Sequence, residues 1–279
     1  MPTQKRERKR AGHQARAAAV AAARRRQQRR TRAVAGVFLA LVLIAGLAVV
    51  VGGGDDDDQD VASTNTTVAE TNTTAAAKRP VDLPPVAAGA SIAGDTPCPP
   101  ADGSAQRTTT FAKPPPLCVN VARTYQAEVQ TTKGTMVVDL DVRNATRTVN
   151  NFVVLSRYKF YDGIAFHRII PGFVIQGGDP QQTGTGGPGY RFEDELPKAG
   201  SYKVGSLAMA NSGANTNGSQ FFIVTGDTGT SLPPQYSLFG QVTQGLDVVK
   251  AIEDTGIAGT QDGKPSEVVK INSITIKET

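Results

Sequence analysis

Arg168 and two glutamines, Gln176 and Gln220, are polar residues set among apolar, strand-like residues, and they are the side chains most able to do chemistry in this sequence. They belong to two stretches, FHRIIPGFVIQGGD at 166–179 and NTNGSQFFIVT at 215–225, with no obvious nucleophile beside them. An arginine keeps its charge at any physiological pH, and a buried amide must find hydrogen-bond partners. The combination favours catalysis by binding geometry over catalysis by bond-making.

Two other kinds of site are only weakly indicated. His167 and nearby acidic residues suggest a hydrolase, but the sequence has no G-x-S-x-G elbow, and the only other histidine is His13 in the N-terminal tail. The run GTGGPG at 184–189 is similar to a phosphate loop, yet it leads into YRFEDE rather than a helix and lacks the following lysine. Neither hydrolysis nor nucleotide binding is favoured, and we expect no cofactor and no metal.

The positive charge of the chain is confined to its first residues. The 279 residues carry a formal net charge of +5, but residues 1–32 hold twelve Lys/Arg and one Glu, so they carry +11 and the other 247 residues carry −6. The next nineteen residues, 33–51, lack any charge or strongly polar group, and as a helix they would span roughly 28 Å, about the hydrocarbon core of a bilayer. This pattern predicts a basic tail followed by a single transmembrane helix in the cell membrane.

The flanks of the apolar segment predict its orientation. Cytoplasmic flanks carry the Lys/Arg excess, whereas the other flank begins GGGDDDD at 52–58, so we expect a cytoplasmic N-terminus and an extracytoplasmic C-terminal domain. A cleaved signal peptide is the alternative, although its apolar run is usually shorter and ends in a clearer cleavage site. The basic arm could instead bind nucleic acid, but no aromatic residues are interleaved, so we expect no nucleic-acid partner.

Residues 52–123 are predicted to be a low-complexity linker. They are rich in Thr, Asn, Ala, Asp, Gly and Pro with no sustained apolar period, so we expect them not to bury enough surface to order themselves. Cys98 and Cys118 lie near the end of this segment, on the oxidising side of the membrane. A disulfide between them would contribute about 3 kcal/mol of loop-closure entropy and is favoured over two free thiols, whereas a zinc site would need further ligands.

The folded domain is predicted at 124–279, where short runs of strand-like residues dominate. They occupy 125–131, 135–141, 165–170, 173–177, 206–210, 220–225, 238–242 and 268–276. Only 146–158 and 246–253 show the helical spacing of apolar residues. Many short strands with two helices predict a mainly β fold, an antiparallel barrel or sandwich, rather than a parallel α/β fold.

Four longer strings carry a resemblance to a known family. They are FHRIIPGFVIQGGDP at 166–180, GTGGPGYRFEDE at 184–195, SLAMANSGANTNGSQFFIVT at 206–225 and LFGQVTQGLDVVKAI at 238–252. In this order they resemble the successive signatures of the cyclophilin family of peptidyl-prolyl cis-trans isomerases. The resemblance implies a closed eight-stranded antiparallel β-barrel capped by two α-helices. It also implies a surface groove for proline-containing peptides, and hence a catalyst of Xaa-Pro rotation. With the predicted topology, we expect its substrates to be unfolded exported proteins.

The resemblance makes Arg168 the catalytic arginine and Gln176 the residue that orients it and the substrate carbonyl. The expected substrate-binding residues are Phe166, Phe173, Val174, Ala210, Asn211, Ser212, Gln220, Phe222, Leu232 and Tyr236. Strand alternation places Phe166 and Arg168 on one face and His167 on the other. Rotation about an Xaa-Pro amide has a barrier of about 18–20 kcal/mol. A fixed cation that donates a hydrogen bond to the prolyl nitrogen would favour the twisted state over both planar ones.

The chain departs from the family pattern inside the expected groove. It has no Trp, Ser231 stands where many members have a pocket tryptophan, and Tyr236 stands where a histidine is frequent, so cyclosporin-type inhibitor binding is doubtful. Val174 and Ser212 replace a commoner methionine and alanine, changes expected to adjust substrate preference more than the reaction. The alternative function is a non-catalytic peptide-binding or scaffold domain of the same fold, which the presence of Arg168 disfavours.

Overall fold

The computed structural model of the chain describes residues 77–260 and 262–279. The predicted basic tail at 1–32, the apolar segment at 33–51 and the first part of the linker lie outside the described residues. None of the helices within the described ranges has both the length and the apolar character that a bilayer crossing requires. The described C-terminal part of the chain clusters as one compact unit.

Eight antiparallel strands form one sheet, in the order β10-β3-β4-β9-β7-β8-β6-β5. The strands are β3 (Tyr125–Thr131), β4 (Gly134–Leu140), β5 (Arg168–Ile170), β6 (Val174–Gly177), β7 (Ser206–Met209), β8 (Phe221–Val224), β9 (Leu238–Gln244) and β10 (Ile271–Glu278). The mainly β prediction is confirmed. The closed barrel that we expected is not shown: the sheet is a curled half-barrel with edge strands β5 and β10, and an isolated antiparallel bridge joins Ala165 to Lys270, which precede these two strands.

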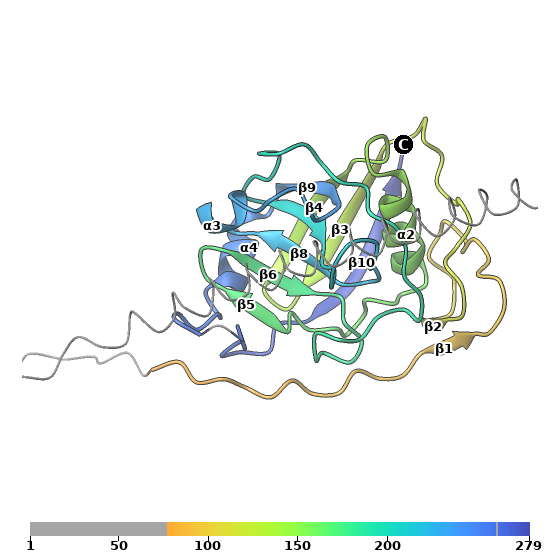
Figure 1. The fold of residues 1–279 in the computed structure, drawn as a ribbon. Helices are drawn as coiled ribbons and strands as arrows, with labels where there is room; N and C mark the ends of the chain where they lie inside the picture. Colours follow the sequence, from red (N-terminus) through yellow and green to blue (C-terminus); the bar gives the residue numbers. More distant parts are fainter. Residues whose placement is uncertain (1–76, 261) are drawn as a thin grey trace, which may run out of the picture. The chain divides into compact units, whose positions relative to one another are not determined.

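Both predicted helices form where the apolar spacing indicated them. They are α2 (Thr146–Arg157) and α4 (Leu246–Glu253), and a further short helix, α3 (Asp227–Thr230), was not predicted (Figure 1). The carboxylate of Glu195 accepts the backbone N–H groups of Arg147 and Thr148, at 3.0 and 2.8 Å. An acceptor at this end satisfies N–H groups that have no partner within the helix and complements its dipole. A distant residue, rather than a local cap, therefore stabilises the start of α2.

The sheet is apolar on its inner face and, over three strands, also on its outer face. Phe152 of α2 occupies the inner core, where its ring centroid lies 5.3 Å from those of Tyr161 and Phe239 and 5.7 Å from that of Phe221. The alternate residues of β6, β7 and β8 build a second, smaller cluster on the opposite face. Its buried members are Val174, Tyr202, Ala208, Phe222 and Val224. An apolar outer face needs a partner, so this cluster indicates where a ligand could bind.

The prediction that residues 52–123 form a linker unable to order itself is wrong from residue 77 onward. This segment contains β1 (Ala90–Ile92) and β2 (Thr108–Phe111), which pair in parallel, and in Figure 1 it runs below the sheet toward the α2 end of the domain. Phe111 is only 1% exposed and Val119 only 5%. The argument from composition failed because a segment with few apolar residues can still be ordered when those residues pack into a core that other segments form.

A disulfide joins Cys98 to Cys118 within this segment, as the sequence interpretation favoured. The Cα atoms of the pair lie 5.5 Å apart, across a sequence separation of 20 residues. Phe111 lies inside the loop that the bond closes, and its ring packs edge-on against Tyr158 at a centroid distance of 5.4 Å. The bond therefore fastens a segment that is already packed on the domain.

Candidate functional site

Arg168 lies at the start of the edge strand β5, opposite Gln176 of β6 in the strand register. Its guanidinium carbon is 5.8 Å from the centroid of the Phe173 ring, a cation–π geometry that favours one orientation of the side chain. Partial burial lowers the pKa of Arg168, and the nearby Tyr236 phenol acts in the opposite sense. An arginine remains cationic under such shifts. The site therefore holds a permanent, partly desolvated positive charge beside an aromatic face.

Two glutamine amides connect this charge to the neighbouring loop. The Nε2 of Gln176 donates to Oε1 of Gln220 at 3.0 Å, and the Nε2 of Gln220 donates to the carbonyl oxygen of Gly186 at 2.9 Å. Each hydrogen bond fixes the orientation of the amide that donates it. The two bonds therefore link β6, the residue before β8 and the glycine-rich loop. Gln176 and Gln220, which the sequence interpretation singled out as unusual polar residues, are thus joined directly.

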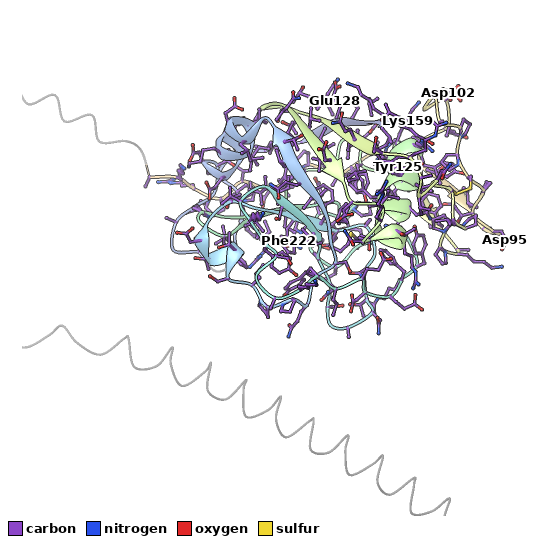
Figure 2. The ribbon with its side chains drawn as sticks, turned by 90° about the horizontal axis from the view of Figure 1, so that it is seen from above. Asp95, Asp102, Tyr125, Glu128, Lys159 and Phe222 are labelled. Atoms are coloured by element: carbon purple, nitrogen blue, oxygen red, sulfur yellow. A yellow bond between two sulfur atoms is a disulfide. The ribbon has the colours of Figure 1, made fainter. Side chains whose placement is uncertain are left out.

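The outer apolar cluster lies beside Arg168, whose guanidinium faces the ring of Phe173, a residue packed against this cluster. Phe222, which is 4% exposed, packs edge-on against Tyr236 at a centroid distance of 5.4 Å, and it lies opposite Gln176 in the register of β8 with β6. The partly buried residues around this cluster are Phe173, Ala210, Leu232, Tyr236 and Leu238. As the sequence interpretation expected, Phe221 and Ile223 of β8 face the main core instead. The residues predicted to hold the proline ring therefore gather in one apolar cluster, and Figure 2 shows Phe222 of this cluster well separated from Asp95 of the N-terminal segment.

A groove with a volume of about 780 Å³ shares the lining residue Ala210 with the outer apolar cluster. One wall is the sheet, through Gln176 and Gln220, and the other is the glycine-rich loop at 184–190. The predicted binding residues Ala210, Asn211 and Ser212 also line it. The backbone N–H of Ala210 is already used by Gln220, whose carbonyl oxygen accepts it at 2.9 Å. Most of the predicted binding residues therefore belong to this groove or to the outer apolar cluster, and Ala210 belongs to both.

Phe166 is not brought to this site. It is 0% exposed in the main core, where its ring centroid lies 6.5 Å from that of Phe221. The alternation argument was wrong here because β5 begins only at Arg168, so Phe166 precedes the regular strand and turns inward. The ring fits there because Gly177 has no side chain: a Cβ at that position would come within 3.2 Å of the Phe166 ring. His167, expected to point inward, is 9% exposed.

The sequence reasoning missed the role of Asp179 in building the groove. Its carboxylate is 0% exposed and accepts backbone N–H groups from Gln181, Thr183, Gly184 and Gly186, at 2.8, 3.0, 2.6 and 3.2 Å. Donors that a phosphate loop would offer to an anion are thus already occupied by a side chain of this chain. The available signal was the Asp-Pro pair at 179–180, followed two residues later by a run of Thr and Gly, a typical turn-forming arrangement.

Tyr202 is a second residue that the sequence did not single out. It is 3% exposed within the outer cluster, and its hydroxyl donates to the carbonyl oxygen of Tyr236 at 2.7 Å. The same hydroxyl accepts the backbone N–H of Tyr236 at 3.2 Å. Tyr202 therefore fixes the backbone that presents Tyr236 to the pocket.

Comparison with known proteins identifies the family. Residues 126–276 match the family described as cyclophilin type peptidyl-prolyl cis-trans isomerase/CLD. Peptidyl-prolyl cis-trans isomerase A of Mycobacterium tuberculosis is 43% identical over 171 residues, which cover 55% of this chain and 92% of that protein. A peptidyl-prolyl cis-trans isomerase of Helicobacter pylori is 41% identical over 140 residues, covering 49% and 85% respectively.

Solved structures agree with the sequence relatives. A cyclophilin type peptidyl-prolyl cis-trans isomerase of Cryptosporidium parvum superposes with a TM-score of 0.51 at 33% identity, covering 56% of this chain and 99% of that one. A second structure of that protein, crystallised in the presence of the dipeptide Ala-Pro, gives a TM-score of 0.50. With its matching sequence and its antiparallel eight-stranded sheet, this chain belongs to the cyclophilin family and is a peptidyl-prolyl cis-trans isomerase of the cyclophilin type.

Proposed function

We propose that this isomerase binds an Xaa-Pro segment with the proline ring in the pocket of Phe222 and Tyr236, and that Arg168 donates a hydrogen bond to the prolyl nitrogen as the amide twists. The observation that carries the proposal is the guanidinium of Arg168 beside the Phe173 ring and opposite Gln176, next to an outer apolar cluster. A twisted amide has a pyramidal nitrogen with a free lone pair, whereas a planar amide does not. The donor therefore stabilises the transition state more than either ground state.

The energetic demand on this arrangement is modest. Each 1.36 kcal/mol of preference for the twisted state gives about tenfold in rate, so an acceleration of about 10⁴-fold requires about 5–6 kcal/mol. Hydrogen bonds from a charged donor contribute about 1.5–3 kcal/mol each, and more where water is excluded. Arg168 and a carbonyl held by the Gln176 amide can supply most of this preference together. No nucleophile or cofactor is needed, because no covalent bond is made or broken.

The substrates we propose are exported proteins that fold outside the cytoplasm. The proposal rests on the apolar run at 33–51 with the basic tail before it, and it is consistent with the disulfide between Cys98 and Cys118, since disulfides persist in oxidising compartments. In this view the segment at 33–51 anchors the enzyme in the cell membrane. External protease added to intact cells would digest an extracytoplasmic domain; a domain protected in intact cells but cleaved after lysis would contradict the topology.

A protease-coupled isomerisation assay on an Ala-Pro peptide tests the role of Arg168. We expect Arg168→Ala to lower kcat/KM by about 10²- to 10³-fold, the loss typical of removing one charge-stabilising donor. Arg168→Lys keeps the charge but not the planar fork, so it should recover only part of the rate. Arg143→Ala is the matched control, since Arg143 is exposed and makes no ion pair among the described residues.

The non-catalytic alternative makes the opposite prediction. A peptide-binding scaffold would bind the Ala-Pro peptide with the same affinity in all variants and would not accelerate its isomerisation. Equal rates for the wild type and Arg168→Ala, with tight peptide binding in both, would contradict the catalytic role.

A further inference from the structure

A second cavity shares the lining residue Arg191 with the groove. Its volume is about 760 Å³, and one wall is formed by the proline-rich turn of the N-terminal segment, through Pro114, Pro115 and Leu117. The opposite wall is formed by α2 and by Phe192. The residues that match the family begin at 126, so the proline-rich wall lies outside the part of the chain shared with the family.

The proline-rich wall is held firmly on the domain. Asn150 of α2, which is 4% exposed, accepts the backbone N–H of Cys118 at 2.6 Å and donates to the carbonyl oxygen of Pro116 at 2.9 Å. The disulfide to Cys98 fixes the same turn from the other side. Leu117, flanked by these attachments, is nevertheless 63% exposed. A large apolar side chain held rigidly in solvent at the rim of a cavity is suited to contact a partner.

The second cavity and the groove have Arg191 in common as a lining residue. The other charges around the cavity are already engaged. Arg147 pairs with Glu193, and Glu195 accepts the backbone of α2. Arg191 is exposed and makes no ion pair or side-chain hydrogen bond within the described residues. Among the charged residues that line the cavity, Arg191 is therefore the one whose side chain has no hydrogen-bond or ion-pair partner within the described residues.

We propose that this cavity is an additional subsite for the polypeptide substrate. An extended chain whose Xaa-Pro bond occupies the groove continues past Arg191 and places an apolar side chain against Pro114 and Leu117. An acidic residue of the substrate, between the Xaa-Pro bond and this apolar side chain, faces Arg191. The proposal rests on the proposed function for the position of the Xaa-Pro bond. It adds that this enzyme selects unfolded chains that carry an apolar residue and an acidic residue at a distance from the proline.

The occupant we infer is a continuation of the substrate, because the cavity and the groove share Arg191 and are therefore neighbours. Its rigid wall also reduces the entropy lost on binding, since little of the protein has to be ordered. Strand-like chains advance about 3.3 Å per residue, so a few residues beyond the proline suffice to pass from one cavity to the next. Short peptides would occupy only the groove.

Kinetics on peptides of different length test the subsite. The substrates are an Ala-Pro tetrapeptide and ten-residue peptides that extend it toward either end with one Glu and one Leu, together with versions in which these two become Gln and Ser. For one direction of extension, we expect wild-type kcat/KM to rise about tenfold over the tetrapeptide, as burial of one Leu allows. The Gln/Ser version should lose this gain.

Variants locate the effect on the protein. Leu117→Ser should abolish the gain with the long peptide and leave the tetrapeptide rate unchanged, whereas Leu196→Ser, at another exposed leucine, should change neither. Arg191→Gln should remove the preference for Glu over Gln in the long peptides. A gain that survives Leu117→Ser, or equal rates for all lengths in both directions, would overturn the subsite. An inactive wild type on the tetrapeptide would instead overturn the proposed function.

Discussion

Replacing Phe111 with alanine tests whether residues 77–123 are part of the folded unit or only a tether. The Phe111 ring is 1% exposed and lies 5.4, 6.3 and 6.5 Å, between centroids, from the rings of Tyr158, Tyr190 and Phe160. Its backbone is also attached, since its N–H donates to the carbonyl oxygen of Pro188 at 2.8 Å. The surroundings are therefore held in place and cannot easily collapse into the space that the ring would leave.

The size of the effect depends on this packing. Truncating a buried phenylalanine to alanine usually lowers the free energy of unfolding by about 3–5 kcal/mol, and a site that cannot collapse falls in the upper part of this range. We expect about 4 kcal/mol, which corresponds to a fall in Tm of about 8–16 °C for a domain of this size. A loss of this magnitude is a large fraction of the about 5–15 kcal/mol that stabilises a typical domain.

Urea denaturation followed by circular dichroism, with thermal denaturation as a second probe, measures the change. Leu117→Ala is the matched control, because Leu117 lies on the same segment but is 63% exposed, and its truncation should stay within about 0.5 kcal/mol. If residues 77–123 were a tether, Phe111→Ala would match this control. A decrease in the free energy of unfolding of less than about 1 kcal/mol would refute the packing argument, since truncating a buried phenylalanine usually lowers it by about 3–5 kcal/mol.

Three further outcomes can be measured on the same protein. Removing the disulfide by replacing Cys98 and Cys118 with serine should lower the free energy of unfolding by about 3 kcal/mol, and reductant should then have no further effect on the variant. Burial lowers the pKa of His167, although Asp179 acts in the opposite sense, so on acidification the unfolded state binds this proton before the folded state does. The contribution of neutral His167 to the free energy of unfolding is therefore fully present above about pH 6.5 and is lost as the pH falls below it. His167→Gln should reduce this pH dependence of the free energy of unfolding. Gln220→Ala leaves the Gln176 amide and the Gly186 carbonyl without their hydrogen-bond partners. At about 1 kcal/mol for each lost bond, kcat/KM should fall about 30-fold. An unchanged kcat/KM would show that these hydrogen bonds do not orient the site.

Local periodicity predicted the strands and both longer helices because their signal lies within a few residues. The strand predicted at 125–131 coincides with β3, and the helix predicted at 246–253 coincides with α4. The faces of β8 were also correct, with Phe222 outward and Phe221 inward. Period-two alternation is reliable where a strand is regular and both of its faces are occupied.

Alternation failed at Phe166 because the strand is not regular there. Nothing within the sequence around Phe166 shows that β5 starts two residues later, at Arg168. The inward turn depends on Gly177 of another strand, which leaves room for the ring. A contact between separate strands therefore decided a side-chain direction that local reasoning assigned to the groove.

The residues to which we assign the chemistry were visible in the sequence, because a charge or an amide among apolar strand residues is unusual wherever the chain folds. Arg168, Gln176 and Gln220 needed no tertiary information to be singled out. The residues that shape the groove around them could be recognised only from the tertiary structure. Asp179 shapes the glycine-rich loop, and Phe111 supports that loop through Pro188 from a segment whose composition predicted no structure. Such contacts join residues far apart in the chain, and their free energy arises only when the complementary surfaces meet, so no local pattern records them.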